Sequence, residues 1–190
     1  IDEAHNLVDR AREMYSAELH KKDFLELKRL MKGKNKELHA SCNSINKYFI
    51  ELKKQLGEEY HYVNQEEDKD FYQLLSSFVA KADKYLSMNE EAHRNEELMN
   101  LYFGVLNLLK ISENYDEHYV TYIERYGNDV RLKLFCHDPS LLISQVLKKG
   151  KAAVFFSATL LPMDYFHEIL GGGENSKSVY LKSPFDPANR

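Results

Sequence analysis

Two short clusters of polar side chains contain the residue types that phosphate chemistry uses. Asp2 and Glu3 directly follow Ile1, and Ser157 and Thr159 follow an apolar run. If Ile1 ends a buried strand, the two carboxylates lie at its carboxyl edge, where parallel-sheet proteins bind phosphates and metal ions. The alternative for the same pair is an ordinary helix start, where acidic residues are favoured.

Hydrolysis of ATP needs two carboxylate roles at such an edge. One carboxylate helps to hold Mg²⁺ on the β- and γ-phosphates, and another group orients the attacking water. Asp2 suits the first role and Glu3 the second. A P-loop is missing, because neither Gly-Lys pair, at 33–34 and 150–151, has the preceding glycine and the following hydroxyl that the motif requires. We therefore expect this chain alone not to hydrolyse ATP.

The composition excludes several classes of protein. The chain has 190 residues, of which 43% are hydrophobic and 29% charged, and this argues against wholesale disorder. It contains no apolar run of about 18 residues that could span a bilayer and no secretory leader, so we expect a cytoplasmic protein without a membrane partner. Cys42 and Cys136 lie far apart, and we expect buried or free thiols there rather than a disulfide or a metal site.

Helical periodicity dominates the first two thirds of the sequence. Apolar residues recur at i, i+3, i+4 and i+7 in segments 71–86, 44–57 and 96–110, and again after His5. We expect Ser44 to cap the second of these helices and Gly57 to end it. Because such stripes bury against one another, the sequence predicts a helical bundle over roughly residues 15–115.

The last third of the sequence changes character. Segments 118–126 and 130–136 are rich in Val, Ile, Tyr and Phe with partial alternation, which predicts strands. The Asp-Pro pair at 138–139 is expected to open a helix, with the aspartate as N-cap, and Gly150 to end it. The continuous apolar run at 152–156 is typical of a strand that is buried on both faces of a parallel sheet.

Positive charge is concentrated near the N-terminus, although the formal net charge is −4. Segments 64–70 and 89–97 are acidic instead. The basic stretch is either a solvated helix face or a patch that follows the phosphates of nucleic acid. The DNA-binding candidates are Lys21, Lys22, Lys28, Arg29, Lys32, Lys34 and Lys36.

The order of these features resembles one known family. IDEAH at residues 1–5, a long helical insertion, VFFSATL at 154–160 and SPF at 183–185 are similar to the helicases related to XPD and DinG, in helicase superfamily 2. In that family DEAH is motif II, a mainly helical Arch domain follows it within the first motor domain, and Ser-Ala-Thr or Ser-Gly-Thr is motif III. The resemblance covers essentially the whole chain, and its specificity comes from the pair of motifs.

The resemblance implies a mainly α fold. Residues 15–136 would form an Arch-like helical-bundle insertion with a few strands. Residues 1–14 and 137–190 would be α/β pieces of a RecA-like motor domain, the second of which leads towards a second motor domain. The implied catalytic residues are Asp2, Glu3, His5, Ser157 and Thr159. Among them, Asp2 and Glu3 would bind the nucleotide, Asp2 would bind Mg²⁺, and the other three would couple hydrolysis to movement.

The implied function is that of the middle portion of an ATP-dependent DNA helicase, which translocates on single-stranded DNA and unwinds duplex or forked DNA. Repair or replication proteins would be its partners. Cysteine ligands of an iron-sulfur cluster, where family members have one, lie ahead of motif II and therefore outside this chain. The alternative is a non-enzymatic helical protein-interaction module with accidental motif matches. A P-loop ahead of Ile1 is required by the first hypothesis and unexpected for the second.

Overall fold

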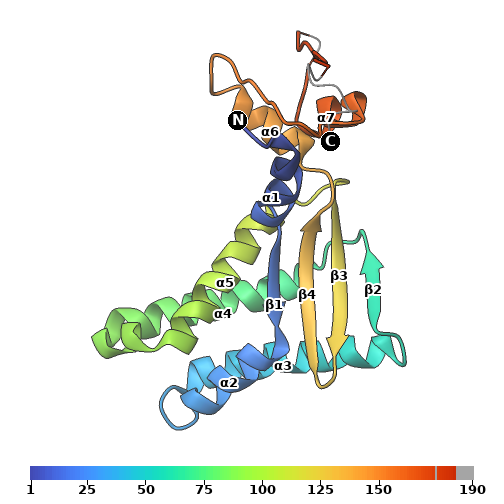
Figure 1. The fold of residues 1–190 in the computed structure, drawn as a ribbon. Coiled ribbons are helices and arrows are strands. Elements are labelled where there is room, and N and C mark those ends of the chain that lie inside the picture. The colour runs from blue at the N-terminus through green and yellow to red at the C-terminus, as the bar shows by residue number, and fades with distance from the viewer. Residues whose placement is uncertain (174, 183–190) are drawn as a thin grey trace, which may run out of the picture. The chain divides into compact units, whose positions relative to one another are not determined.

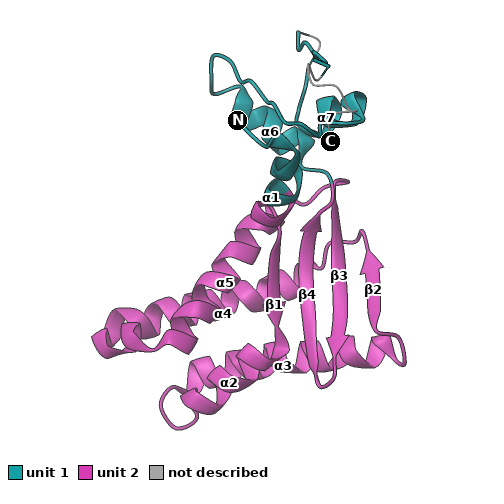
Figure 2. Cartoon of the chain, viewed as in Figure 1, with its two compact units in different colours: residues 1–11, 138–190 teal, residues 12–137 magenta. Residues whose placement is uncertain are grey.

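The chain folds as two compact units. The computed structural model describes residues 1–173 and 175–182, so the SPF segment at 183–185 and the lead towards a second motor domain lie outside the described residues. Unit 1 comprises Ile1–Ala11 with Asp138–Arg190, and unit 2 comprises Arg12–His137 (Figure 2). The predicted boundaries were after residues 14 and 136. The assignment of either unit to a motor or an Arch domain stays a prediction.

The structure is mainly helical, as predicted. The chain starts with the 3-10 turn η1 (Ala4–Asn6) and helix α1 (Leu7–Met14), and α6 (Ser140–Leu147) and α7 (Met163–Ile169) lie in unit 1. Among the described helices, none combines the length and the apolarity needed to cross a bilayer. The elements of unit 2 are, in order, β1 (Ala17–His20), α2 (Lys21–Met31), α3 (Lys36–Leu56), β2 (His61–Asn64), α4 (Lys69–Met88), η2 (Glu90–Arg94), α5 (Glu96–Ser112), β3 (Tyr119–Tyr126) and β4 (Asp129–Cys136) (Figure 1).

Unit 2 has two layers, one of helices and one a sheet. The predicted helical bundle over residues 15–115 needs correction, because β1 and β2 lie within that range. Its strands form one antiparallel sheet in the order β1-β4-β3-β2. Helices α2, α3 and α5 contact this sheet as well as their helical neighbours. Burial alternates along β3 and β4, so one face of the sheet packs on the helices. The predicted strands at 118–126 and 130–136 are confirmed, whereas β1 and β2 pair with them without having been predicted.

The helical layer is organised around four phenylalanines. Phe24, Phe49, Phe71 and Phe78 are all 0% exposed. The ring centroids of Phe24 lie 5.9 Å from those of Phe49 and Phe78, and the Phe49 and Phe71 centroids are 5.8 Å apart. Tilted and edge-on pairs at such distances stabilise a core beyond their buried area. The cluster joins α2, α3 and α4, because each helix contributes at least one ring.

The predicted cap of the second helix is wrong. Helix α3 begins at Lys36, where the Asn35 side chain accepts a hydrogen bond from the Leu38 N–H at 2.9 Å. Ser44 lies inside the helix, and its hydroxyl donates to the Ala40 carbonyl at 3.2 Å. The end at Gly57 is confirmed, since this residue has a φ of 57°, which glycine adopts without steric strain.

The predicted limits of the helix after residue 138 also need correction. Asp138 Oδ1 accepts a hydrogen bond from the Ser140 N–H at 2.9 Å, but Pro139 occupies the N-cap position. The helix ends at Leu147, before Gly150. The aspartate therefore bonds to the N–H of the first residue of α6 from the position before the N-cap.

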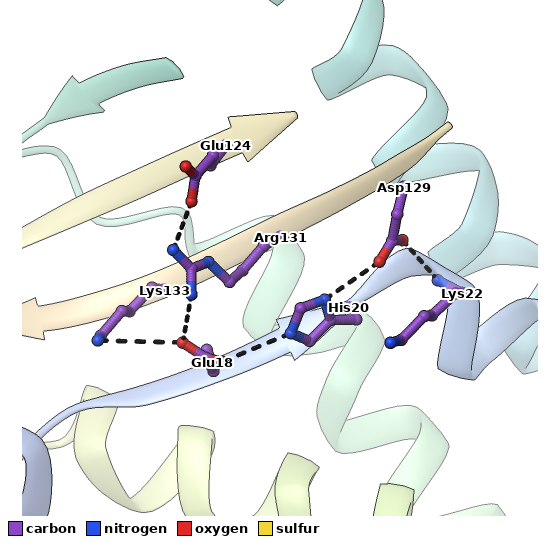
Figure 3. Close-up of polar contacts among 7 residues, drawn as sticks. All are labelled: Glu18, His20, Lys22, Glu124, Asp129, Arg131 and Lys133. Atoms are coloured by element: carbon purple, nitrogen blue, oxygen red, sulfur yellow. Dashed lines mark hydrogen bonds and ion pairs between the residues drawn. The ribbon is translucent and has the colours of Figure 1, made fainter. Parts of the chain in front are cut away.

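Charged side chains lie in a row across the second face of the sheet. Arg131 on β4 lies between Glu18 on β1, at 3.2 Å, and Glu124 on β3 (Figure 3). The Lys133 ammonium is 3.9 Å from Glu18. Opposite charges on facing strands stabilise their pairing, so this row favours the observed register.

The first residue of β4 caps helix α2. Asp129 Oδ1 accepts a hydrogen bond from the Lys22 backbone N–H at 2.9 Å, and Asp129 Oδ2 lies 3.1 Å from His20 Nδ1 (Figure 3). His20 occupies the N-cap position but forms no side-chain cap bond. A free N–H of the helix start is therefore satisfied by a carboxylate 107 positions along the chain. This contact ties the β3–β4 hairpin to the helical layer.

We predict that Asp129→Ala lowers the free energy of unfolding by about 1–2 kcal/mol, because it removes the N-terminal cap of α2. Urea unfolding followed by circular dichroism measures the change. Asn128→Ala in the adjacent β3–β4 turn is the control, since the one contact of the Asn128 side chain among the described residues is with half-buried Lys53 at 3.4 Å. Equal stabilities of the two variants would contradict a capping role.

Candidate functional site

The first residues of the chain lie beside the segment that precedes Ser157. The Ile1 nitrogen donates to the Val154 carbonyl at 2.6 Å, and the Phe156 N–H donates to the Ile1 carbonyl at 3.1 Å. The Ala4 N–H donates in turn to the Phe156 carbonyl at 3.2 Å. In a pair of parallel strands, a residue forms backbone hydrogen bonds with the residues before and after the one that it faces. Ile1 and Phe155 are therefore parallel partners.

The expectation of a doubly buried strand at 152–156 is wrong for this chain. The segment has no assigned strand, Val154 is 70% exposed and Phe156 is 53% exposed. Within the described ranges, only Ile1 and Ala4 form backbone hydrogen bonds with it. A strand becomes buried on both faces when strands flank it and helices cover both sides, and the described residues provide one short neighbour.

This pairing brings four of the five predicted catalytic side chains together. Ser157 Oγ donates to Glu3 Oε2 at 3.2 Å and lies 2.7 Å from His5 Nδ1. His5 Nδ1 is also 3.2 Å from Glu3 Oε2. Thr159 closes the cluster, because its backbone N–H donates to Ser157 Oγ at 3.2 Å and its Oγ1 lies 3.3 Å from the same atom. The Ser157 hydroxyl thus contacts the other three residues.

The backbone at Glu3 has an unusual conformation. Its φ of 48° and ψ of 43° lie in the left-handed region, and it is the one non-glycine residue with positive φ in the part of the chain that the structure describes. Such a residue costs about 1–3 kcal/mol and persists where the surroundings hold it. Here the Glu3 N–H donates to Asp2 Oδ1 at 2.7 Å, and the next residue, Ala4, is 0% exposed. This bend starts η1 and places Glu3 and His5 beside Ser157.

The acidic end of the cluster is open to solvent. The Glu3 side chain is 62% exposed and that of His5 is 34% exposed. Asp2 is also exposed, and its side chain contacts only the neighbouring Glu3 N–H within the described part of the chain. It lies next to the cluster in sequence but is not hydrogen-bonded into it.

Asp2 has the chemistry of a Mg²⁺ ligand in a nucleotide complex. No group of three or more His, Cys, Asp or Glu side chains that could hold a metal ion occurs among the described residues. Mg²⁺ with nucleotides does not need such a group, because one or two carboxylates, the phosphates and water complete its octahedron. The exposed carboxylate of Asp2 fits this arrangement.

The seven basic candidates belong to two helices and the turn between them. Lys21, Lys22, Lys28 and Arg29 belong to α2, Lys32 and Lys34 to the following turn, and Lys36 begins α3. Lys21 and Lys28 are half-buried, and the Lys21 ammonium donates to the Asn128 carbonyl at 3.4 Å. The others are exposed. Five of the seven are therefore exposed, and they come from two helices and the turn between them.

The structure groups two of these candidates with residues that the sequence analysis missed. Lys34 and Lys36 line a shallow groove of about 370 Å³ together with Lys84, Tyr85 and Met88 from α4. The Lys84 ammonium also contacts the Glu37 carboxylate at 3.0 and 3.1 Å. Only the packing of α4 beside the start of α3 brings these residues together, so spacing along the chain contains no signal for them.

The two cysteines take no part in the candidate site. Both carry free thiols and are buried, which confirms the prediction from their spacing. Burial raises the pKa of Cys42 to about 12. A thiol with so high a pKa is protonated at neutral pH and is therefore a poor nucleophile and metal ligand.

A scan against protein-family models finds no match for this chain, and a search of curated proteins finds no significant relative. The functional interpretation therefore depends on the residues and contacts described above.

We predict that Ser157→Ala changes the ring-nitrogen NMR resonances of His5, because the substitution removes the hydroxyl 2.7 Å from Nδ1. Loss of one such hydrogen bond should lower stability by about 1 kcal/mol or less. Ser176→Ala is the control in unit 1, since among the described residues the Ser176 hydroxyl accepts from the Gly173 N–H alone. His5 resonances that stay at the wild-type positions in Ser157→Ala would show that the contact does not form in solution.

Proposed function

We propose that this chain is the middle portion of an ATP-dependent DNA helicase of superfamily 2, related to XPD and DinG. One observation supports this most strongly. His5 of the DEAH sequence and Ser157 of the SAT sequence, 152 positions apart, are in hydrogen-bond contact. Two accidental motif matches give no reason for their side chains to meet. In this proposal, residues 1–14 and 137–190 belong to a RecA-like motor domain and residues 15–136 to an Arch-like insertion.

The roles of the two carboxylates follow from their contacts. Asp2 is exposed and would hold Mg²⁺. When bound, Mg²⁺ neutralises charge on the β- and γ-phosphates of ATP. Glu3 Oε2 contacts Ser157 and His5, whereas Oε1 has no partner within the described residues. Glu3 would therefore be oriented through one oxygen and would use the other to position the attacking water and accept its proton.

The Ser157 hydroxyl provides a physical route for coupling. It has a single proton and can donate to only one acceptor at a time. A movement of segment 157–159 would change whether Ser157 donates this proton to Glu3 or to His5. The orientation of the Glu3 carboxylate would change as a consequence. Rearrangements linked to DNA movement would in this way alter the Glu3 carboxylate, which positions the attacking water.

The insertion would supply part of the DNA-binding surface. Lys32, Lys34 and Lys36 are exposed, and Tyr85 lies beside the last two in the groove. Cations that follow phosphates together with an aromatic ring that stacks on bases suit single-stranded nucleic acid. The substrate would be single-stranded or forked DNA, with ATP and Mg²⁺ as cofactors and the cytoplasm as the location.

The complete helicase would need parts that this chain does not supply. A P-loop and a second motor domain would come from other segments of the protein, and the chain alone would be inactive. Repair or replication proteins would be its partners. The buried thiols of Cys42 and Cys136 give no basis for an iron-sulfur cluster within this chain.

We predict that Glu3→Gln in the complete protein lowers ATP turnover by about 10²- to 10⁴-fold, because glutamine cannot accept the proton of the attacking water. A steady-state phosphate-release assay with DNA present measures this. Glu13→Gln, at an exposed position of α1, should leave turnover unchanged. Turnover of Glu3→Gln within about twofold of the wild-type rate would exclude the assigned role.

We predict that Lys34→Gln/Lys36→Gln weakens binding of single-stranded DNA and makes it less sensitive to salt. Each lost phosphate contact should reduce the slope of log K against log salt by about 0.7. Fluorescence anisotropy with a labelled oligonucleotide measures both quantities. Lys47→Gln/Lys110→Gln removes two exposed lysines elsewhere in unit 2 and serves as the control. Equal slopes for the two double variants would show that the groove does not contact DNA.

A further inference from the structure

We propose that the outer edge of strand β2 binds a basic, extended polypeptide segment of a partner protein, which adds a strand to the sheet. The binding surface consists of β2 and its flanking carboxylates, residues 58–67, and is called the acidic edge below. This inference concerns unit 2 alone and does not depend on the helicase assignment.

Strand β2 is the last strand of the sheet and pairs on one side only. The strand order is β1-β4-β3-β2, and within unit 2 no described strand pairs with the outer side of β2 (Figure 1). The Arg125 N–H donates to the Tyr60 carbonyl at 2.8 Å, which identifies Tyr60 and Arg125 as a hydrogen-bonded pair. The register continues with His61 opposite Glu124.

The backbone groups that point outward follow from this register. Hydrogen-bonded and non-hydrogen-bonded pairs alternate along an antiparallel ladder. Tyr62 and Asn64 therefore bond to β3, while the N–H and C=O groups of His61 and Val63 point away from it. These four groups are the donors and acceptors that an added strand uses.

The side chains at this edge are unusually exposed for their type. Tyr60 is 77% exposed, Tyr62 50%, Val63 46% and the neighbouring Tyr126 54%. Natural proteins protect free edges with lysine, proline, bulges or covering segments. Residues 58–67 contain neither lysine nor proline. The edge thus combines free backbone groups with apolar contact surface.

Charge identifies the chemistry of the occupant. Glu58 and Glu59 precede the strand, Glu66 and Glu67 follow it, and all four are exposed. Among the described residues, one weak ion pair involves these four, with the Glu67 carboxylate 3.9 Å from the Lys69 ammonium. Arg125 is occupied by the Gly57 and Gly127 carbonyls, at 3.2 and 3.3 Å. A basic segment is complementary to such a surface.

The same charges disfavour two other occupants. A second copy paired through β2 would bring the carboxylates of both edges together, and like charges across an interface are destabilising. Nucleic acid would place its phosphates against these carboxylates. The partner segment is therefore polypeptide, extended and positively charged.

The experiment uses the 190-residue chain and a fluorescent peptide of about ten residues with alternating lysine and valine, enough to cover the strand and its flanks. A peptide with alternating glutamate and valine is the matched probe. We expect the lysine peptide to bind in a salt-sensitive way, the glutamate peptide not to bind, and the amide NMR resonances of His61 and Val63 to shift on binding.

Two variants test the two parts of the proposal. Val63→Pro removes an outward N–H without breaking a bond to β3, and it should weaken peptide binding about tenfold, whereas Val63→Ala should stay within about twofold. Glu58→Gln/Glu59→Gln should weaken binding about fivefold, and Glu90→Gln/Glu91→Gln, an exposed acidic pair on η2, should not.

Several outcomes would overturn the proposal. They are absence of binding by the lysine peptide, equal binding of both peptides, full binding by a Val63→Pro protein whose circular dichroism is native, or a dimer that the same substitution dissociates. If Val63→Pro does not fold, the comparison of the two glutamine variants decides. None of these results depends on ATP turnover or DNA binding, so they are separable from a failure of the proposed function.

Discussion

Three backbone hydrogen bonds between residues 1–4 and segment 154–156 are the constraint on which the candidate site depends. They align two stretches from opposite ends of the chain, and they leave Glu3 in a left-handed bend beside Ser157. Unit 2 makes this possible because its own ends meet. Arg12 Nε donates to the His137 carbonyl at 3.0 Å, and Ser16 Oγ accepts from the Cys136 N–H at 3.0 Å. A long insertion whose entry and exit are adjacent can be accommodated without separating the segments that flank it.

Unit 2 has opposite charge at the two ends of one helix. The turn before α3 carries Lys32 and Lys34, with Lys36 at its first position, and the acidic edge follows its last residue. A helix of 21 residues spans about 31 Å, which exceeds the screening length of about 10 Å at moderate salt. The two proposals therefore assign different partners to separate regions, DNA at the basic end and a basic polypeptide at the acidic end. The modest net charge of the chain conceals this separation.

The sequence predicts those elements whose signal is local and periodic. The stripe at 71–86, the stop at Gly57 and the two long strands are confirmed, because burial on one face imposes a period of 3.6 or 2. Strands β1 and β2 have four residues each, too few for a period, and only pairing with β3 and β4 defines them. The cap of α2 comes from Asp129, which is 107 positions from Lys22, so the sequence around α2 contains no signal for this cap. At the site, residue types suggest the chemistry. Neither the positive φ of Glu3 nor the grouping of Lys84 and Tyr85 with Lys34 and Lys36 around one groove could be predicted.

The most direct test is a crystal structure of the complete protein with Mg²⁺ and a non-hydrolysable ATP analogue. The proposal predicts that the Asp2 carboxylate binds the ion directly or through one water. It also predicts that Glu3 lies within hydrogen-bond reach of a water in line with the γ-phosphate, and that His5 and Ser157 remain in contact. A nucleotide bound away from Asp2 and Glu3, or a separation of residues 1–5 from segment 154–159, would contradict the account.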